Sequence, residues 1–89
     1  PLALEELQDC VAGMQNVEMD YERKEIIKAY VKFLDALPVT ERRVFLCRYW
    51  YVDSVEAIAD KFGFSQSKVK TMLHRTRAKL RKQLAEEGY

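Results

Sequence analysis

The stretch that decides the fold runs from Val55 to Lys82 and reads VEAIADKFGFSQSKVKTMLHRTRAKLRK. Its apolar spacing predicts a short helix over residues 55–62, a tight turn, and a longer helix from Gln66 to about Glu86. Ser54 and Ser65 precede the two runs, and serine is a favoured N-cap residue. We therefore expect two capped helices joined by a turn, with the rest of the chain as their support.

Three residues within this stretch have the types and spacing of a DNA-binding helix-turn-helix. They are Ala59, Gly63 and Val69, at offsets of four and six residues. A small side chain at Ala59 lets two helices cross closely, and Gly63 can take the left-handed backbone conformation that a turn requires. Val69 is β-branched and apolar, and is expected to pack back against the shorter helix.

Charge is distributed unevenly along the chain. Residues 1–60 hold 7 Lys/Arg and 12 Asp/Glu, a net charge of −5, whereas residues 61–89 hold 8 Lys/Arg and 2 Asp/Glu, a net charge of +6. No acidic residue occurs between Lys61 and Ala85. A basic pole suits a polyanion and an acidic pole suits a protein partner.

The composition favours one small all-α domain. The chain has 89 residues with only 3 Gly and 2 Pro, which is few for a protein rich in turns. We predict four helices with a C-terminal helix-turn-helix and no winged elements. Residues 20–89 are expected to form the domain and residues 1–19 a linker or N-terminal arm.

Other classes of protein find little support in the composition. Cys10, Cys47 and the single His74 are too few and too scattered for a zinc site, so we expect no metal and no cofactor. Two unpaired cysteines fit reduced thiols in a cytoplasmic protein. No long apolar run predicts a membrane span. No catalytic triad, glycine-rich phosphate loop or paired carboxylates are present, so we expect neither an enzyme nor a small-molecule substrate.

Two further helices are expected before the helix-turn-helix. The first spans residues 20–36, with Asp20 as N-cap and an end at Pro38. Its predicted inward stripe consists of Ile27, Tyr30, Val31, Leu34 and Leu37. The second is predicted to start with Thr40 as N-cap and to present a broad apolar surface, made by Val44, Phe45, Leu46, Cys47 and Tyr49.

The outer surface of the second helix and its end lead to two more expectations. Arg42, Arg43 and Arg48 are predicted to point outward. The aromatic run Tyr49, Trp50 and Tyr51 is predicted to pack in the core or over the following helix, because aromatic residues at helical spacing usually pack inward.

The N-terminal turns of the fourth helix supply the candidate DNA contacts, since a recognition helix enters the major groove with these turns first. Glutamine can bond an adenine edge, lysine can bond guanine acceptors, and threonine can meet a thymine methyl group. The predicted base-reading residues are Gln66, Ser67, Lys70, Thr71 and His74. The predicted phosphate contacts on this helix are Ser65, Lys68 and Arg75.

The residues from Phe33 to Leu84 resemble the C-terminal region-four domain of bacterial RNA polymerase sigma factors, most nearly the extracytoplasmic-function type. The resemblance rests on Leu37-Pro38 before the second helix and on ERRVF at 41–45 opening it, with Arg48-Tyr49 near its end. It also rests on EAIA at 56–59, SKVK at 67–70, HRTR at 74–77 and Lys79-Leu80. One departure is YWYVDS at 49–54, which replaces a connection that usually contains glycine.

The resemblance implies a function and partners. Such domains read the −35 promoter element in double-stranded DNA through the fourth helix, while the domain body holds the β-flap of RNA polymerase core. Arg42 and Arg43 would then contact phosphate or an activator, and an anti-sigma factor would be a further partner. Residues 1–19 resemble the linker to a sigma region-two domain.

Two other functions compete with this one. A helix-turn-helix output domain of a two-component or quorum-sensing regulator has a similar four-helix layout, and predicts dimers on palindromic sites. A protein-interaction adaptor of the transcription machinery would instead use the basic helix against acidic protein.

Overall fold

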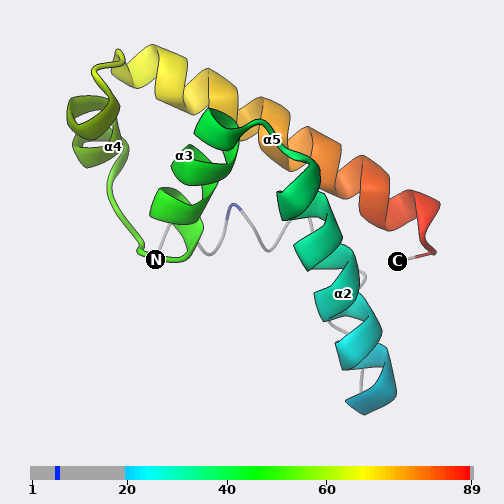
Figure 1. The fold of residues 1–89 in the computed structure, drawn as a ribbon. Helices are drawn as coiled ribbons and strands as arrows, with labels where there is room; N and C mark the ends of the chain where they lie inside the picture. The colour runs from blue at the N-terminus through cyan, green and yellow to red at the C-terminus, as the bar shows by residue number, and fades with distance from the viewer. Residues whose placement is uncertain (1–5, 7–19, 89) are drawn as a thin grey trace.

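The computed structural model describes Glu6 and residues 20–88, and in these residues the elements are helices joined by short connections. They are α2 (Asp20–Ala36), α3 (Val39–Tyr49), α4 (Val55–Phe62) and α5 (Gln66–Glu86) (Figure 1). The all-α prediction is confirmed, as are the predicted spans of α2, α4 and α5, and no strand occurs in the described part of the chain. The expectations for residues 1–5, 7–19 and 89 lie outside it.

Helix α5 is the element against which the others pack. α4 contacts its first part, α3 reaches along it as far as Arg77 and Lys79, and α2 contacts its later part (Figure 1). Its inner stripe consists of Val69, Leu73, Thr76, Leu80 and Leu84, which are all buried. Leu80 is 0% exposed and Leu84 is 3% exposed, so the second half of α5 belongs to the core and does not project into solvent.

The core lies where α2, α3, α4 and α5 meet. Phe45 is 1% exposed, and its ring centre lies 5.9 Å from that of Phe33 and 4.7 Å from that of Tyr49. Ile58 and Val69 are 0% exposed and join the helix-turn-helix to this core. The position of α5 is therefore set by apolar burial on both sides of α3.

The predicted inward stripe of α2 is partly wrong. Ala29, Phe33 and Leu37 form its buried face, whereas Ile27 is 61% exposed and Val31 is 51% exposed. The reason is that α2 carries apolar residues on two adjacent faces and has only one neighbouring core to fill. Periodicity shows that a face is apolar, but it does not show which of two faces a partner covers.

Three expectations for α3 and its end are also corrected. Thr40 is not an N-cap, because the Pro38 carbonyl already accepts the Arg42 backbone N–H at 2.9 Å and the helix begins at Val39. The Arg48 side chain does not point outward, since only 11% of it is exposed. Tyr49 is buried as predicted, but Trp50 and Tyr51 are 75% and 68% exposed because the helix ends at Tyr49.

The connection from α3 to α4 turns at Val52, which has a φ of 56°. This left-handed conformation is unusual for a β-branched residue. Val52 lies in the segment 49–54, where sigma region-four domains usually contain glycine. The chain therefore makes a left-handed turn here without a glycine residue. No described helix is long and apolar enough to span a membrane.

Candidate nucleic-acid interface

The helix-turn-helix turn has the geometry that its sequence predicts. Gly63 has φ 69° and ψ 30°, and the Phe64 backbone N–H donates to the Ala59 carbonyl at 3.0 Å. Ala59 is 4% exposed and Val69 is 0% exposed. The three predicted structural residues therefore act together. Gly63 turns the chain in the left-handed conformation, and the buried Ala59 and Val69 allow α4 and α5 to pack closely against each other.

Both serine caps are present as hydrogen bonds. The Ser54 hydroxyl accepts the Ala57 backbone N–H at 3.0 Å, and the Ser65 hydroxyl accepts the Lys68 backbone N–H at 3.0 Å. Each cap satisfies one of the donors that a helix leaves unpaired in its first turn. The start of α5 is thereby fixed, and Ser65 lies exposed at the end of the helix that carries positive dipole charge.

All five predicted base-reading side chains are exposed. Ser67, Lys70, Thr71 and His74 recur at helical spacing on the side of α5 away from Val69 and Leu73. Gln66 is also exposed, in the first turn. The structure therefore brings the five residues to one end of one helix, with their polar groups in solvent.

The predicted phosphate contacts of α5 lie beside this set. Lys68 and Arg75 are exposed. The Lys68 ammonium lies 4.0 Å from the centre of the Phe64 ring, an arrangement that holds it at the turn. Lys68 is therefore placed next to the capped N-terminus, where backbone N–H groups can also meet an anion.

Arg42 and Arg43 take different positions. Arg43 is exposed, whereas Arg42 is half-buried and donates through Nη2 to the Leu37 carbonyl at 3.3 Å. Arg42 thus occupies the C-terminal end of α2, where a cation is favourable. Of the two, only Arg43 keeps its side chain exposed at the surface.

Two other lysines, Lys61 on α4 and Lys79 on α5, form ion pairs with acidic side chains. Lys61 Nζ lies 3.4 Å from an Asp53 carboxylate oxygen and 3.9 Å from the Cys47 sulfur. The pKa of Lys61 is raised by the Cys47 sulfur and by the Asp53 carboxylate. Lys79 pairs with Glu41 at 3.2 Å. These pairs reduce the positive charge that α4 and the later turns of α5 can offer to a polyanion.

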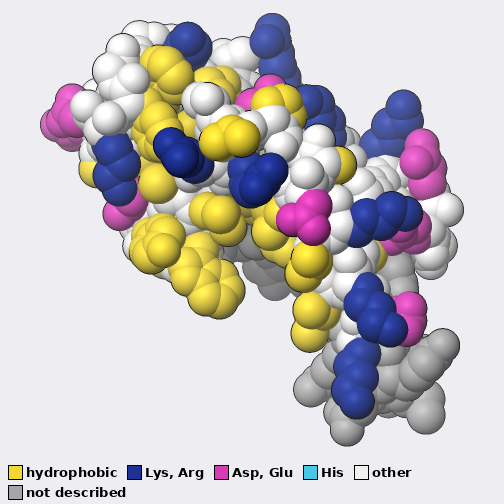
Figure 2. All heavy atoms as spheres, viewed as in Figure 1, with side chains coloured by type: hydrophobic (Ala, Val, Ile, Leu, Met, Phe, Trp, Pro, Cys, Tyr) yellow, Lys and Arg dark blue, Asp and Glu magenta, His cyan; other side chains and the backbone are white. Residues whose placement is uncertain are grey.

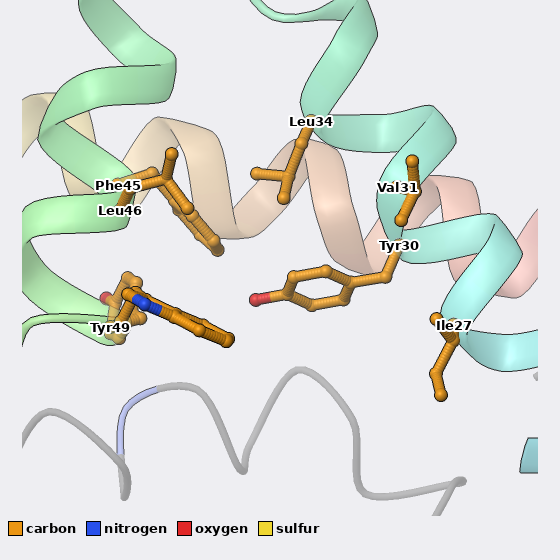
Figure 3. A pocket seen from close by; sticks show the side chains of 8 residues that line it. Ile27, Tyr30, Val31, Leu34, Phe45, Leu46 and Tyr49 are labelled. Atoms are coloured by element: carbon orange, nitrogen blue, oxygen red, sulfur yellow. The ribbon is translucent and has the colours of Figure 1, made fainter.

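An apolar groove lies between α2 and α3, on a different surface from the exposed side chains of α5. It has a volume of about 390 Å³ and is lined by Ile27, Tyr30, Val31, Leu34, Phe45, Leu46, Tyr49 and Trp50 (Figure 3). Hydrophobic side chains gather along one face of the molecule, among Lys and Arg side chains (Figure 2). The residues of this groove were not predicted from the sequence, although the excess of apolar residues on α2 was a signal for it.

The comparison with family models agrees with this geometry. A model described as Sigma-70, region 4 matches residues 27–80, which include most of α2, all of α3 and α4, and the first half and more of α5. The chain belongs to the sigma-70 region 4 family. Neither the curated proteins nor the solved structures gave a match.

Membership of region 4 defines the general role of the domain. It is a DNA-binding, non-catalytic domain of a sigma factor, and it acts in transcription initiation with promoter DNA and RNA polymerase. The matched residues include the turn at Gly63 and every predicted DNA-contacting residue of α5. In the described residues, no cluster of three or more His, Cys, Asp or Glu side chains could hold a metal ion.

Proposed function

We propose that this region 4 domain reads the −35 element of promoters through the first turns of α5, within a cytoplasmic sigma factor of the extracytoplasmic-function type. The observation that carries the proposal is the exposed set Gln66, Ser67, Lys70, Thr71 and His74 on a helix whose opposite side is buried. A capped and buried helix presents its outer side chains in one fixed orientation, which base reading requires.

Each base-reading residue has a chemical assignment in this proposal. The Gln66 amide suits an adenine edge, the Lys70 ammonium suits guanine O6 and N7, and the Thr71 methyl suits thymine. Ser67 and His74 bond base edges beside them. Ser65, Lys68 and Arg75 bind phosphates and set the register of the helix.

The two arginines of α3 are assigned by their exposure. Arg43 is free to reach a phosphate or an activator from the exposed surface of α3. Arg42 contributes less, because its guanidinium is drawn to the Leu37 carbonyl. An Arg43→Ala variant should therefore weaken DNA binding or activation more than an Arg42→Ala variant that retains its fold.

The groove between α2 and α3 is assigned to the β-flap of RNA polymerase. It is open and apolar, and Ile27, Val31 and Trp50 keep more than half of their surface exposed, at 61%, 51% and 75%. Exposed apolar patches of this kind mark protein interaction sites. An anti-sigma factor that covers the same groove would compete with polymerase.

The decisive experiment is a selection of bound duplexes from a random pool, with polymerase core and the full sigma factor present. The parent should enrich one short −35-like motif. A variant with Gln66, Lys68, Lys70 and Arg75 all changed to Ala should enrich none. If this variant selects DNA as well as the parent does, the assignment of α5 is wrong.

The two rival functions give different results in the same setting. A response or quorum-sensing regulator would form dimers and select a palindrome without polymerase. An adaptor that binds acidic protein would select no duplex and would show no steep loss of DNA affinity as salt rises. The matched family and the polar outer face of α5 favour the hypothesis of a promoter-reading sigma factor domain.

A further inference from the structure

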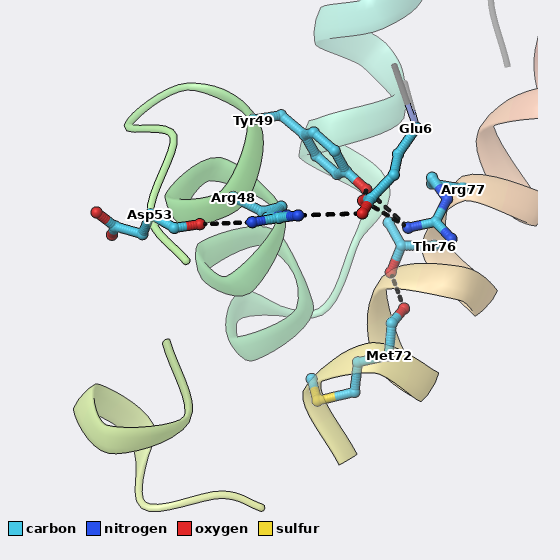
Figure 4. Close-up of polar contacts among 7 residues, drawn as sticks. All are labelled: Glu6, Arg48, Tyr49, Asp53, Met72, Thr76 and Arg77. Atoms are coloured by element: carbon cyan, nitrogen blue, oxygen red, sulfur yellow. Dashed lines mark hydrogen bonds and ion pairs between the residues drawn. The ribbon is translucent and has the colours of Figure 1, made fainter. Parts of the chain in front are cut away.

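A carboxylate from far outside the helix-turn-helix lies at the junction of α3 and α5. Glu6 Oε1 lies 3.1 Å from Arg48 Nη2, and Glu6 Oε2 lies 3.2 Å from Arg77 Nη1 (Figure 4). The Tyr49 hydroxyl donates to Glu6 Oε2 at 2.8 Å and accepts from Arg77 Nη1 at 2.8 Å. Both oxygens of the carboxylate are therefore bound by cationic or phenolic donors.

The residues around this carboxylate form a site that needs an anion. Only 11% of the Arg48 side chain and 20% of the Arg77 side chain are exposed. Tyr49 is 8% exposed, and its ring packs on Phe45. Two guanidinium groups partly withdrawn from water repel each other unless a negative charge lies between them. Arg48 is also held by the Asp53 carbonyl at 3.0 Å, which orients it toward Glu6.

The ionisation of Glu6 agrees with this geometry. Burial raises its pKa, but hydrogen bonds from Arg48 and Tyr49 and the charges of Arg48 and Arg77 outweigh burial and lower the pKa. Glu6 is therefore a carboxylate at neutral pH.

Arg77 connects this site to the DNA-facing side of α5. Lys70, His74 and Arg77 are spaced by four and three residues, so they follow one another along the helix. Arg77 lies about 10 Å beyond Lys70 at a rise of 1.5 Å per residue. A carboxylate bound to Arg77 thus neutralises positive charge within about one Debye length of the proposed base-reading residues.

We propose that Arg48, Tyr49 and Arg77 form a carboxylate-binding site whose ligand is Glu6, and that this contact restrains Arg77 from binding DNA phosphate. The site fastens the chain at residue 6 to α3 and α5. The Glu6 contact also lowers the affinity of the domain for duplex DNA, compared with a state in which Glu6 is released. This second effect rests on the proposed function.

The first test is a carboxyl ¹³C NMR titration of the whole chain. The Glu6 signal is assigned as the one that disappears in Glu6→Gln. In the parent, the pKa of the Glu6 carboxyl should lie below its ordinary value of 4.5. In Arg77→Gln, this pKa should rise. Asp35→Asn, at an exposed position of α2, removes an equal charge and should leave the Glu6 midpoint unchanged. A Glu6 midpoint at its ordinary value, or one indifferent to Arg77→Gln, overturns the site.

The second test measures affinity for a random-sequence duplex at several salt concentrations. Glu6→Gln should raise affinity about two- to threefold at low salt, the size expected for one partly screened charge, and should steepen the salt slope by about 0.9. Neither change should occur in an Arg77→Gln background. Asp35→Asn serves again as the equal-charge control.

The outcomes separate this inference from the proposed function. If Glu6→Gln and Asp35→Asn change affinity equally, the restraint on Arg77 is refuted while DNA binding stands. If the parent binds no duplex even with polymerase, the proposed function fails and the restraint fails with it. The NMR titration then still decides whether Arg48, Tyr49 and Arg77 bind the Glu6 carboxylate.

Discussion

At the scale of single residues, two turns of this domain use the left-handed conformation with opposite energetic consequences. Gly63 ends α4 at φ 69°, where a residue without Cβ pays no steric cost. Val52 takes φ 56° between α3 and α4, a conformation that is sterically unfavourable for a residue with a branched Cβ. The surrounding helices therefore impose a conformation on Val52 that its own side chain disfavours.

Exchanging side chains at these turns should shift stability in opposite directions. A Cβ at Gly63 would meet no atom within 4 Å, so Gly63→Ala tests only the backbone strain of the left-handed conformation. This variant should lower the free energy of unfolding by about 1–2 kcal/mol. Gly63→Val should cost more, up to about 3 kcal/mol. Val52→Gly should stabilise the fold by about 1 kcal/mol. Urea unfolding measures all three, and an unchanged midpoint for Gly63→Val would contradict the account of the turn.

Tyr49 is a second residue whose surroundings determine its behaviour. Burial, assisted by the neighbouring Glu6 carboxylate, raises its pKa to about 12 against the opposing effect of Arg77. A raised pKa means that the folded state favours the protonated phenol. The contribution of Tyr49 to stability is therefore complete below pH 10 and is lost as pH rises from about 10 toward about 12.

This dependence predicts a difference between two matched tyrosine substitutions. Two pKa units correspond to a loss of about 2–3 kcal/mol over that range. Tyr49→Phe removes the phenol, so its stability should fall less steeply above pH 10 than that of the parent. Tyr51→Phe, at an exposed position, should follow the parent. Chemical unfolding at pH 9 and pH 11.5 gives the comparison, and parallel slopes for both variants would disagree with it.

At the scale of elements, α5 combines two roles along its length. Its inner stripe from Val69 to Leu84 is buried throughout. Its outer side carries free polar groups in the first turns, whereas Arg77 and Lys79 farther along are paired with Glu6 and Glu41. Base reading is therefore expected only from the first turns, although positive charge continues to Lys82.

Single alanine variants should separate these roles. Gln66→Ala and Lys70→Ala should relax the base preference, costing about 1–3 kcal/mol at the positions they read. Lys68→Ala and Arg75→Ala should weaken binding to all sequences and reduce the salt slope by about 0.9 each. Lys82→Ala removes the same charge near the C-terminal end of α5, and should change neither the affinity for DNA nor the salt slope. Duplex titrations with polymerase present provide the measurement; a Lys82→Ala effect equal to that of Lys68→Ala would argue for a diffuse field.

At the scale of the whole molecule, the side of α5 that we propose faces DNA and the apolar groove are two different surfaces built on one core. Phe45 and Tyr49 line the groove and also belong to the core against which α5 packs. We therefore expect that a partner in the groove and DNA on α5 can be bound at the same time. A change at the rim of the groove should affect the protein partner without affecting DNA.

The same substitution at two exposed valines tests this separation. Val31 and Val39 are 51% and 56% exposed, but only Val31 lines the groove. Val31→Glu places a charge in an apolar site and should weaken binding to a β-flap fragment at least tenfold, because a buried unpaired charge is costly. Val39→Glu should bind the fragment like the parent. Both should keep the parent's melting temperature within a few degrees, and equal loss in both would exclude the groove as the flap site.

The sequence by itself determined the helix-turn-helix. Ser54, Gly63 and Ser65 act within a few residues of their own position, so local chemistry is enough to place both caps and the turn. The inner stripe of α5 likewise follows the apolar spacing of its own sequence, because a long polar helix with one apolar face buries that face. The family resemblance follows from the same residues, and the family match confirms it.

Only the tertiary structure decided which of the remaining surfaces are covered. α2 has two apolar faces, and the docking of α3 and α5 buries Phe33 while leaving Val31 in the open groove. The spacing of Arg48 predicts a side chain in solvent, yet its guanidinium contacts a carboxylate 42 residues away in sequence. Contacts of this kind depend on how whole helices pack, and no local pattern of residues records them.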